Sequence, residues 1–271
     1  VFGKFGLPQL GAVGCGWATT LGYWLLWSAL VPGLIWRPQY RAYRLFAHFE
    51  WPERGRLMEL LRIGLPIGGM IFIEGSMFVG AALLIGSLGA TAIAGHQVAI
   101  NFAALAFMVP LGVAGAITVR VGNALGRGEP LAARSVGRVG IGLTVITQTV
   151  SALVMLLAPR WIASWYTSDP AVIEVAVTLL RLGAVFQLSD GIQAAAAGAL
   201  RGYQETRIPM LLTMLAYWGV GMPAGWLLTF QFGVGAPGMW FGMIGGLTVA
   251  AIVLTARFHR ISRRESGTGV A

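Results

Sequence analysis

Long apolar runs, free of charge or nearly so, alternate along the chain with short segments that carry arginine. A helix needs about 20 apolar residues to cross the hydrocarbon core of a bilayer, and the strands of a membrane barrel would alternate polar and apolar residues, which these runs do not. The pattern predicts an all-α integral membrane protein with about seven transmembrane helices. These helices are predicted over residues 10–36, 63–87, 90–119, 139–159, 182–200, 208–232 and 239–256.

Composition agrees with that pattern. Of 271 residues, 56% are hydrophobic and only 11% are charged, and the mean hydropathy of +0.74 is far above that of an ordinary soluble domain. The single cysteine, Cys15, excludes an intrachain disulfide and is interpreted as a small apolar residue of a helix.

The basic residues give an orientation. If the N-terminus lies outside, 16 of the 19 Lys and Arg residues fall on one side of the membrane, which the positive-inside rule makes the cytoplasmic side. The C-terminus is then cytoplasmic. The formal charge of +9 is thus explained by topology, and no nucleic-acid partner is expected because the arginines accompany no recognition motif.

The longest charged segment divides the chain into two parts. Residues 37–57 mix arginines with aromatic residues, which is typical of a cytoplasmic linker lying along the membrane interface. The predicted organisation is one helix in residues 1–36, that linker, a six-helix bundle over 58–258 and a cytoplasmic tail over 259–271. Because Val1 opens directly into an apolar run, we expect the chain to begin inside a longer polypeptide.

Two carboxylates lie deep inside the predicted spans. Glu74 is 12 residues from Arg62 and Asp190 is 11 from Arg201, which places both roughly 16 to 18 Å from the cytoplasmic edge at 1.5 Å per residue. A carboxylate in the bilayer is costly and normally faces a bundle interior or a watery cavity. The pair therefore predicts a cation or proton site; the alternative is a protonated acid hydrogen-bonded between helices.

Amide side chains form two stripes at helical spacing. One contains Gln187 and Gln193 on either side of Asp190, and the other contains Gln97 and Asn101. These side chains are interpreted either as the lining of a substrate path or as hydrogen-bonding groups between helices.

Several enzyme classes are excluded or weakened. The chain has no Lys after Lys4, which excludes a retinal Schiff base in the last helix, and it contains neither a Gly-x-Ser-x-Gly turn nor the phosphate-cradling Lys of a P-loop. An intramembrane aspartyl protease remains an alternative, although its usual Tyr-Asp and Gly-x-Gly-Asp contexts do not surround the two carboxylates. We therefore predict a protein that is not an enzyme and that needs no cofactor.

Four motifs in order along the chain resemble one family. Taken together they are similar to the multidrug and toxic compound extrusion (MATE) transporters, in particular their bacterial NorM-like branch. The motifs are Ile63–Pro66, His96–Asn101, Arg120–Gly126 and the stretch from Asp190–Gln193 to Leu200–Tyr203.

The resemblance implies a fold of twelve helices in two lobes. This chain would be the last helix of the N-terminal lobe, the interlobe linker and the complete C-terminal lobe, with the missing N-terminal lobe as its partner in the bacterial inner membrane. Members export organic cations in exchange for Na⁺ or H⁺, and their second-lobe cation site maps onto Glu74 and Asp190. Phe186 stands where some members carry a tyrosine. A lipid-linked-sugar flippase of the same superfamily is the alternative.

Overall fold

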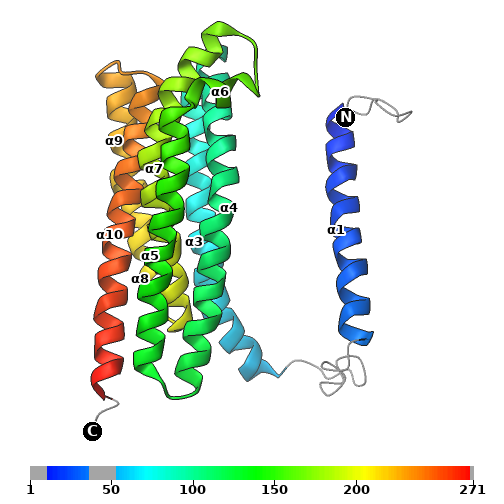
Figure 1. Ribbon diagram of the computed structural model, residues 1–271, viewed down its shortest axis with the longest axis vertical. Helices are drawn as coiled ribbons and strands as arrows, with labels where there is room; N and C mark the ends of the chain where they lie inside the picture. The colour runs from blue at the N-terminus through cyan, green and yellow to red at the C-terminus, as the bar shows by residue number, and fades with distance from the viewer. Residues whose placement is uncertain (1–10, 37–52, 269–271) are drawn as a thin grey trace. The chain divides into compact units, whose positions relative to one another are not determined.

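The computed structural model describes residues 11–36 and 53–268, and every regular element within them is helical. Seven helices there are long and apolar enough to cross a membrane, which confirms the predicted number and fold class (Figure 1). The chain forms two compact units, Val1–Leu57 and Met58–Ala271. Each is described by itself.

The first unit contains helix α1, Gly11–Trp36. Large apolar side chains on several sides of this helix are exposed, including Trp17, Trp24 and Leu25, as expected of a helix whose surface meets lipid or another bundle. Most of the predicted linker, residues 37–52, lies outside the described residues. The rest is helical, because α3 begins at Arg54.

The second unit is a bundle of six spans. Helix α7 packs against α4, α5 and α10 and carries the longest stretch of buried residues, Gln193–Leu200. The elements are α3 (Arg54–Gly86), α4 (Ala90–Gly126), α5 (Pro130–Leu157), the short α6 (Pro159–Ser164), α7 (Pro170–Gly202), a sixth span made of α8 (Arg207–Met214), η1 (Leu215–Gly221), α9 (Met222–Trp226) and η2 (Leu227–Gln231), and α10 (Ala236–Thr268).

Proline and capping residues mark where helices begin. Pro130, Pro159 and Pro170 open α5, α6 and α7, where a missing N–H costs nothing. The side chain of Asp169 accepts a hydrogen bond of 2.9 Å from the backbone N–H of Ala171 and so caps α7. Gly128 makes the turn between α4 and α5 with φ of 73°, a conformation that favours glycine.

Small residues allow the helices of this unit to approach closely. A Cβ on Gly198 of α7 would lie 2.6 Å from the carbonyl oxygen of Ala114 in α4, and a Cβ on Gly242 of α10 would collide with Gly225 of α9. Such contacts are typical of membrane bundles, in which close backbone packing replaces the hydrophobic effect.

The predicted cytoplasmic loops are shorter than expected. The segment 120–138, predicted as a loop, is helical except for a turn at 127–129, and the predicted tail 259–271 continues α10 as far as Thr268. Arg120 and Arg138 thus lie inside helices rather than at their ends. The long side chain of arginine can reach the membrane interface from a helix that continues beyond the hydrocarbon.

Candidate functional site

Asp190 lies in the middle of α7 and is nearly inaccessible, with 4% of its surface exposed. The neighbouring Gly191 lets α5 approach, since a Cβ there would lie 2.5 Å from Gln148 and 3.0 Å from Thr144. Among the described residues, Asp190 Oδ1 has no hydrogen-bond partner, and neither has Gln193 Oε1 one turn further on. α7 therefore presents two buried, unpartnered oxygens on one face.

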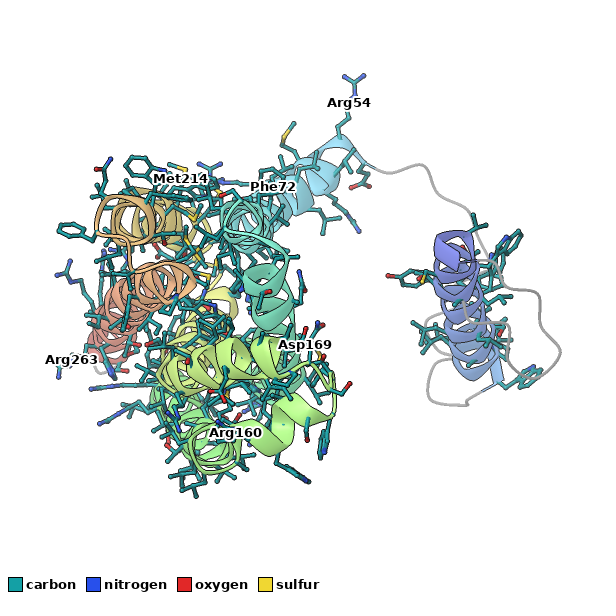
Figure 2. The ribbon with its side chains drawn as sticks, turned by 90° about the horizontal axis from the view of Figure 1, so that it is seen from above. Arg54, Phe72, Arg160, Asp169, Met214 and Arg263 are labelled. Carbon is teal, nitrogen blue, oxygen red and sulfur yellow. The ribbon has the colours of Figure 1, made fainter. Side chains whose placement is uncertain are left out.

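Glu74 lies half-buried on α3, which runs beside the sixth span. A Cβ on Gly69 would lie 2.8 Å from Met210 Sδ and one on Gly80 would lie 3.0 Å from Met222 Cε. Figure 2, seen from above, shows Phe72 of α3 and Met214 of α8 on the same side of the bundle. α3 and the sixth span run parallel, so Glu74 lies at the same height in the bundle as η1.

Tyr217 of η1 completes the cluster. Its side chain is fully buried, and its hydroxyl has no hydrogen-bond partner in residues 11–36 and 53–268. Glu74 interacts electrostatically with Asp190, and both carboxyl groups interact electrostatically with Tyr217. The next residue of η1 is Trp218, whose indole N–H donates a 3.3 Å hydrogen bond to Ser76 Oγ of α3, which fixes the register between the two elements.

Three segments far apart in sequence thus bring two carboxyl groups and a phenol together inside the bundle. We call Glu74, Asp190, Gln193 and Tyr217 the acidic cluster. Burying a polar oxygen without a partner costs on the order of 1–3 kcal/mol, and more for a charged group. A proton or a cation bound among these oxygens would remove that cost. In the part of the chain that the structure describes, three or more His, Cys, Asp or Glu side chains nowhere gather as a metal site.

One basic residue also interacts with the acidic cluster. Arg201, in the last turn of α7, interacts electrostatically with Glu74. Its Nε is buried without a partner among the described residues. A cation entering beside Glu74 would therefore meet Arg201 as a competitor for the same carboxylate.

The structure places Gln187 in a different environment from Asp190. The Gln187 amide donates a 2.8 Å hydrogen bond to the carbonyl oxygen of Ala103 in α4. It accepts another from Gln148 of α5, whose Nε2 also donates to the Gln187 carbonyl at 3.1 Å. Gln187 is fully buried and joins three helices, so in this structure it makes the interhelical hydrogen bonds expected under the second of its two interpretations.

Phe186 belongs to a buried aromatic group. Its ring contacts those of Phe78 and Trp240 at centroid distances of 5.9 and 5.5 Å, and Trp240 Nε1 donates a 3.2 Å hydrogen bond to His96 Nδ1. Only 2% of Phe186 is exposed. It therefore packs between α3 and α10 rather than lining an opening in this conformation.

Gln97 and Asn101 lie on the exposed side of α4 within the second unit. The Asn101 amide donates a 2.7 Å hydrogen bond to the Gln97 carbonyl oxygen, while the Gln97 side chain remains accessible. Their position fits a lining role, which stays a prediction.

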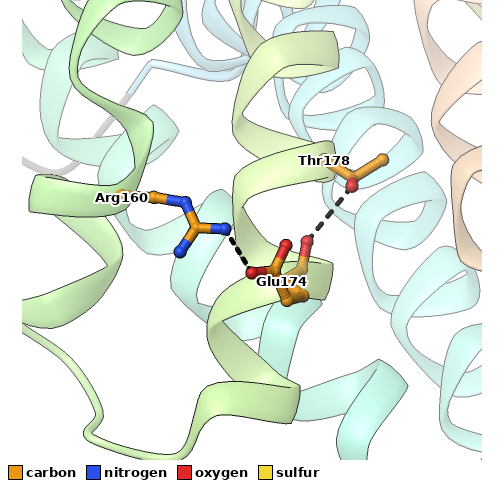
Figure 3. A network of polar contacts seen from close by, with 3 residues as sticks. All are labelled: Arg160, Glu174 and Thr178. Atoms are coloured by element: carbon orange, nitrogen blue, oxygen red, sulfur yellow. Dashed lines mark hydrogen bonds and ion pairs between the residues drawn. The ribbon is translucent and has the colours of Figure 1, made fainter.

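A separate polar contact occurs beside the short α6. Arg160 of α6 pairs with Glu174 of α7, and Thr178 donates a 3.1 Å hydrogen bond to the Glu174 carbonyl oxygen (Figure 3). Both charged side chains are exposed, so the pair contributes at most about 1 kcal/mol to stability. It holds the start of α7 and belongs to no site.

Tyr217 and Arg201 were missed as site residues by the sequence analysis. A tyrosine in the charge-free run 208–256 gives no signal of its own, although it is the only tyrosine in that run. From the sequence, Arg201 is interpreted only as a marker of topology and as part of a family motif. The folded structure is needed to show that both residues interact electrostatically with Glu74.

The MatE family profile matches residues 66–227. The chain is 46% identical to "Multidrug resistance protein PmpM" of Pseudomonas aeruginosa, over 97% of this chain and 56% of the relative. It is 49% identical to "Probable multidrug resistance protein NorM" of Xanthomonas axonopodis pv. citri, over 98% of this chain and 58% of the relative. The chain therefore spans a little over half the length of these curated relatives.

A solved structure has the same fold. The "eukaryotic MATE transporter AtDTX14" superposes with a TM-score of 0.85 at 23% identity, over 99% of this chain and 60% of that one. The profile covers more than half of the chain and includes both Glu74 and Asp190. Together with the seven helices long enough to span a bilayer, these matches show that the chain belongs to the MATE family of multi-pass membrane transporters.

Proposed function

We propose that this chain supplies the ion-coupling lobe of an antiporter that exports organic cations and other amphipathic toxic compounds in exchange for Na⁺ or H⁺. The observation that carries the proposal is the acidic cluster, in which Asp190 Oδ1, Gln193 Oε1 and Tyr217 Oη are buried without partners among the described residues. The names of the relatives, multidrug resistance proteins, support the same class of cargo.

Exchange follows from competition for the two carboxyl groups. Two carboxylates close together in a poorly solvated site favour binding of a proton or a cation. Na⁺ would take the carboxylate, amide and phenol oxygens as ligands, and a proton would neutralise one carboxyl group. An organic cation that uses the same negative charge displaces either ion, so loading cargo and releasing the coupling ion become linked.

Alternating access requires a second bundle. Carriers built from structural repeats move one repeat against the other around a site at the midplane, so we place an N-terminal lobe of the same polypeptide opposite this one. The excess of arginine at one end of the helices supports a bacterial inner membrane with the C-terminus in the cytoplasm.

The test uses a two-lobe transporter that contains this chain, expressed in a drug-sensitive bacterium. Glu74→Gln and Asp190→Asn should each leave the amount of inserted protein unchanged and reduce ethidium efflux by about tenfold or more. The exposed turn residue Glu129 is the matched control, and Glu129→Gln should keep wild-type efflux. Normal efflux by both amide variants over a range of pH and Na⁺ concentration would disprove the proposal.

A further inference from the structure

A basic groove runs between α5 and α10 at their cytoplasmic ends, away from the acidic cluster. Its volume is about 570 Å³. It is lined by two turns of α5 and two of α10, through Arg134, Arg138, Ala256, His259, Arg260 and Arg263. Helical spacing puts the paired arginines of each helix on one face, so four guanidinium groups from two helices line a single opening.

The packing beneath the groove fixes its width. Gly137 of α5 sits so close to the ring of Phe258 in α10 that no Cβ fits between them, and Phe258 is fully buried. The Phe258 ring also contacts that of Tyr203, with centroids 6.2 Å apart. The groove therefore has a rigid floor, and its arginines are held by helices rather than by a mobile loop.

The groove has a positively charged lining. No acidic side chain is among the described residues that line it. Within the same described part of the chain, the Nε of Arg134 is buried without a hydrogen-bond partner. Guanidinium groups gathered in this way bind phosphate oxygens through charge-assisted, often bidentate hydrogen bonds. The chemistry of the groove is thus that of a phosphate site.

An apolar surface continues from the groove toward the middle of α5. A second hollow beside it is lined by Leu131, Arg134, Ser135, Arg138 and Val139, and the side chains of Leu131 and Val139 are 64% and 67% exposed. Exposed apolar side chains then follow along α5 at Leu143, Ile146 and Val150. Positive charge and exposed hydrocarbon meet at one helix end.

We propose that this groove binds an anionic phospholipid, with its phosphate among Arg134, Arg138, Arg260 and Arg263 and its acyl chains along the apolar face of α5. A basic pocket between transmembrane helices on the cytoplasmic side suits such headgroups. A free phosphate ion matches the arginines but leaves the adjoining apolar face without a partner. Bound lipid would bridge α5 and α10 over the contact between Gly137 and Phe258.

The experiment measures lipid binding by native mass spectrometry on the purified two-lobe protein in detergent. Phosphatidylglycerol and phosphatidylcholine serve as probes, and inorganic phosphate as the competitor. The double variant Arg138→Gln/Arg260→Gln removes two exposed groove arginines. Arg120→Gln/Arg207→Gln removes two exposed arginines at the same end of the helices, on α4 and α8, outside the groove.

Wild type should bind phosphatidylglycerol in preference to phosphatidylcholine. The groove variant should bind it about thirtyfold more weakly, which corresponds to about 1 kcal/mol for each arginine, and the control pair should change binding less than threefold. A loss of threefold or more confined to the groove variant supports the proposal. A smaller loss, an equal loss in the control pair, equal binding of phosphatidylcholine, or full displacement by inorganic phosphate would overturn it. Each readout is independent of ethidium efflux.

Discussion

Gln187 and Asp190 lie one turn apart on α7, and both are buried, yet the hydrogen bonding of their side chains differs. Gln187 donates to Ala103 and accepts from Gln148, so both the nitrogen and the oxygen of its amide have a partner. Asp190 keeps an oxygen without a partner among the described residues. A satisfied polar group stabilises a bundle, whereas an unsatisfied one marks a place where something else binds.

The helices around Gln187 also differ from those around Asp190. The glutamine pair connects three helices that pack closely, α4, α5 and α7. In the acidic cluster, by contrast, α3 and η1 supply the half-buried Glu74 and the buried Tyr217. One turn of helix thus divides a structural hydrogen-bond network from the candidate coupling site.

The largest expected effect is loss of transport without loss of stability at Asp190. Asp190→Asn should reduce the efflux rate of a two-lobe transporter at least tenfold, because an amide holds neither a proton nor a cation by charge. The melting temperature should fall by no more than a few degrees, since the replaced oxygen has no hydrogen bond to lose. Purified protein assayed for both quantities tests this. A drop in stability matching the drop in efflux would make Asp190 a structural residue.

The opposite result is expected for the glutamine pair. Gln148→Leu or Gln187→Leu leaves a buried amide unpaired and should lower the free energy of unfolding by about 1–3 kcal/mol. The double variant should lose less than the sum of the two, because it removes both partners at once. Thermal unfolding of all four proteins measures this coupling. Efflux per folded molecule should stay close to wild type, and its loss would show that the network takes part in coupling.

A smaller effect is expected at Tyr217. Tyr217→Phe removes a hydroxyl that has no partner among the described residues, so stability should be unchanged or slightly higher. If the hydroxyl binds the coupling ion, the concentration of Na⁺ or H⁺ that gives half-maximal efflux should shift several-fold while the maximal rate is retained. An unshifted ion dependence would remove Tyr217 from the acidic cluster.

The smallest effect is expected in the exposed turn at Glu129. A 2.9 Å hydrogen bond from Arg127, together with the arginine charge, lowers the pKa of Glu129 below its ordinary value of 4.5. The pair therefore adds stability above pH 4.5, and this is lost as the pH falls through the lowered pKa. Melting curves of wild type and Glu129→Gln should differ slightly at neutral pH and converge in acid. Divergence on acidification would contradict this sign.

The sequence predicts the spans because arginine interrupts long apolar runs, and it identifies Glu74 and Asp190 as carboxylates deep within them. It misplaces helix ends because Arg120 and Arg138 lie inside helices, α4 continuing to Gly126 and α5 beginning at Pro130. It also cannot distinguish Gln187 from Gln193. Both are one turn from Asp190, and the partner that satisfies only one of them lies 39 residues earlier, on another helix.

The most direct test of the acidic cluster measures ion release on cargo binding. Ethidium is added to the purified two-lobe protein, and displaced protons are followed with a pH indicator while displaced ²²Na⁺ is counted. Wild type and Gln187→Leu should release one of the two ions in proportion to the cargo bound, and Asp190→Asn should release neither. Release from Asp190→Asn equal to that from wild type would contradict the proposal that this cluster couples ion to cargo.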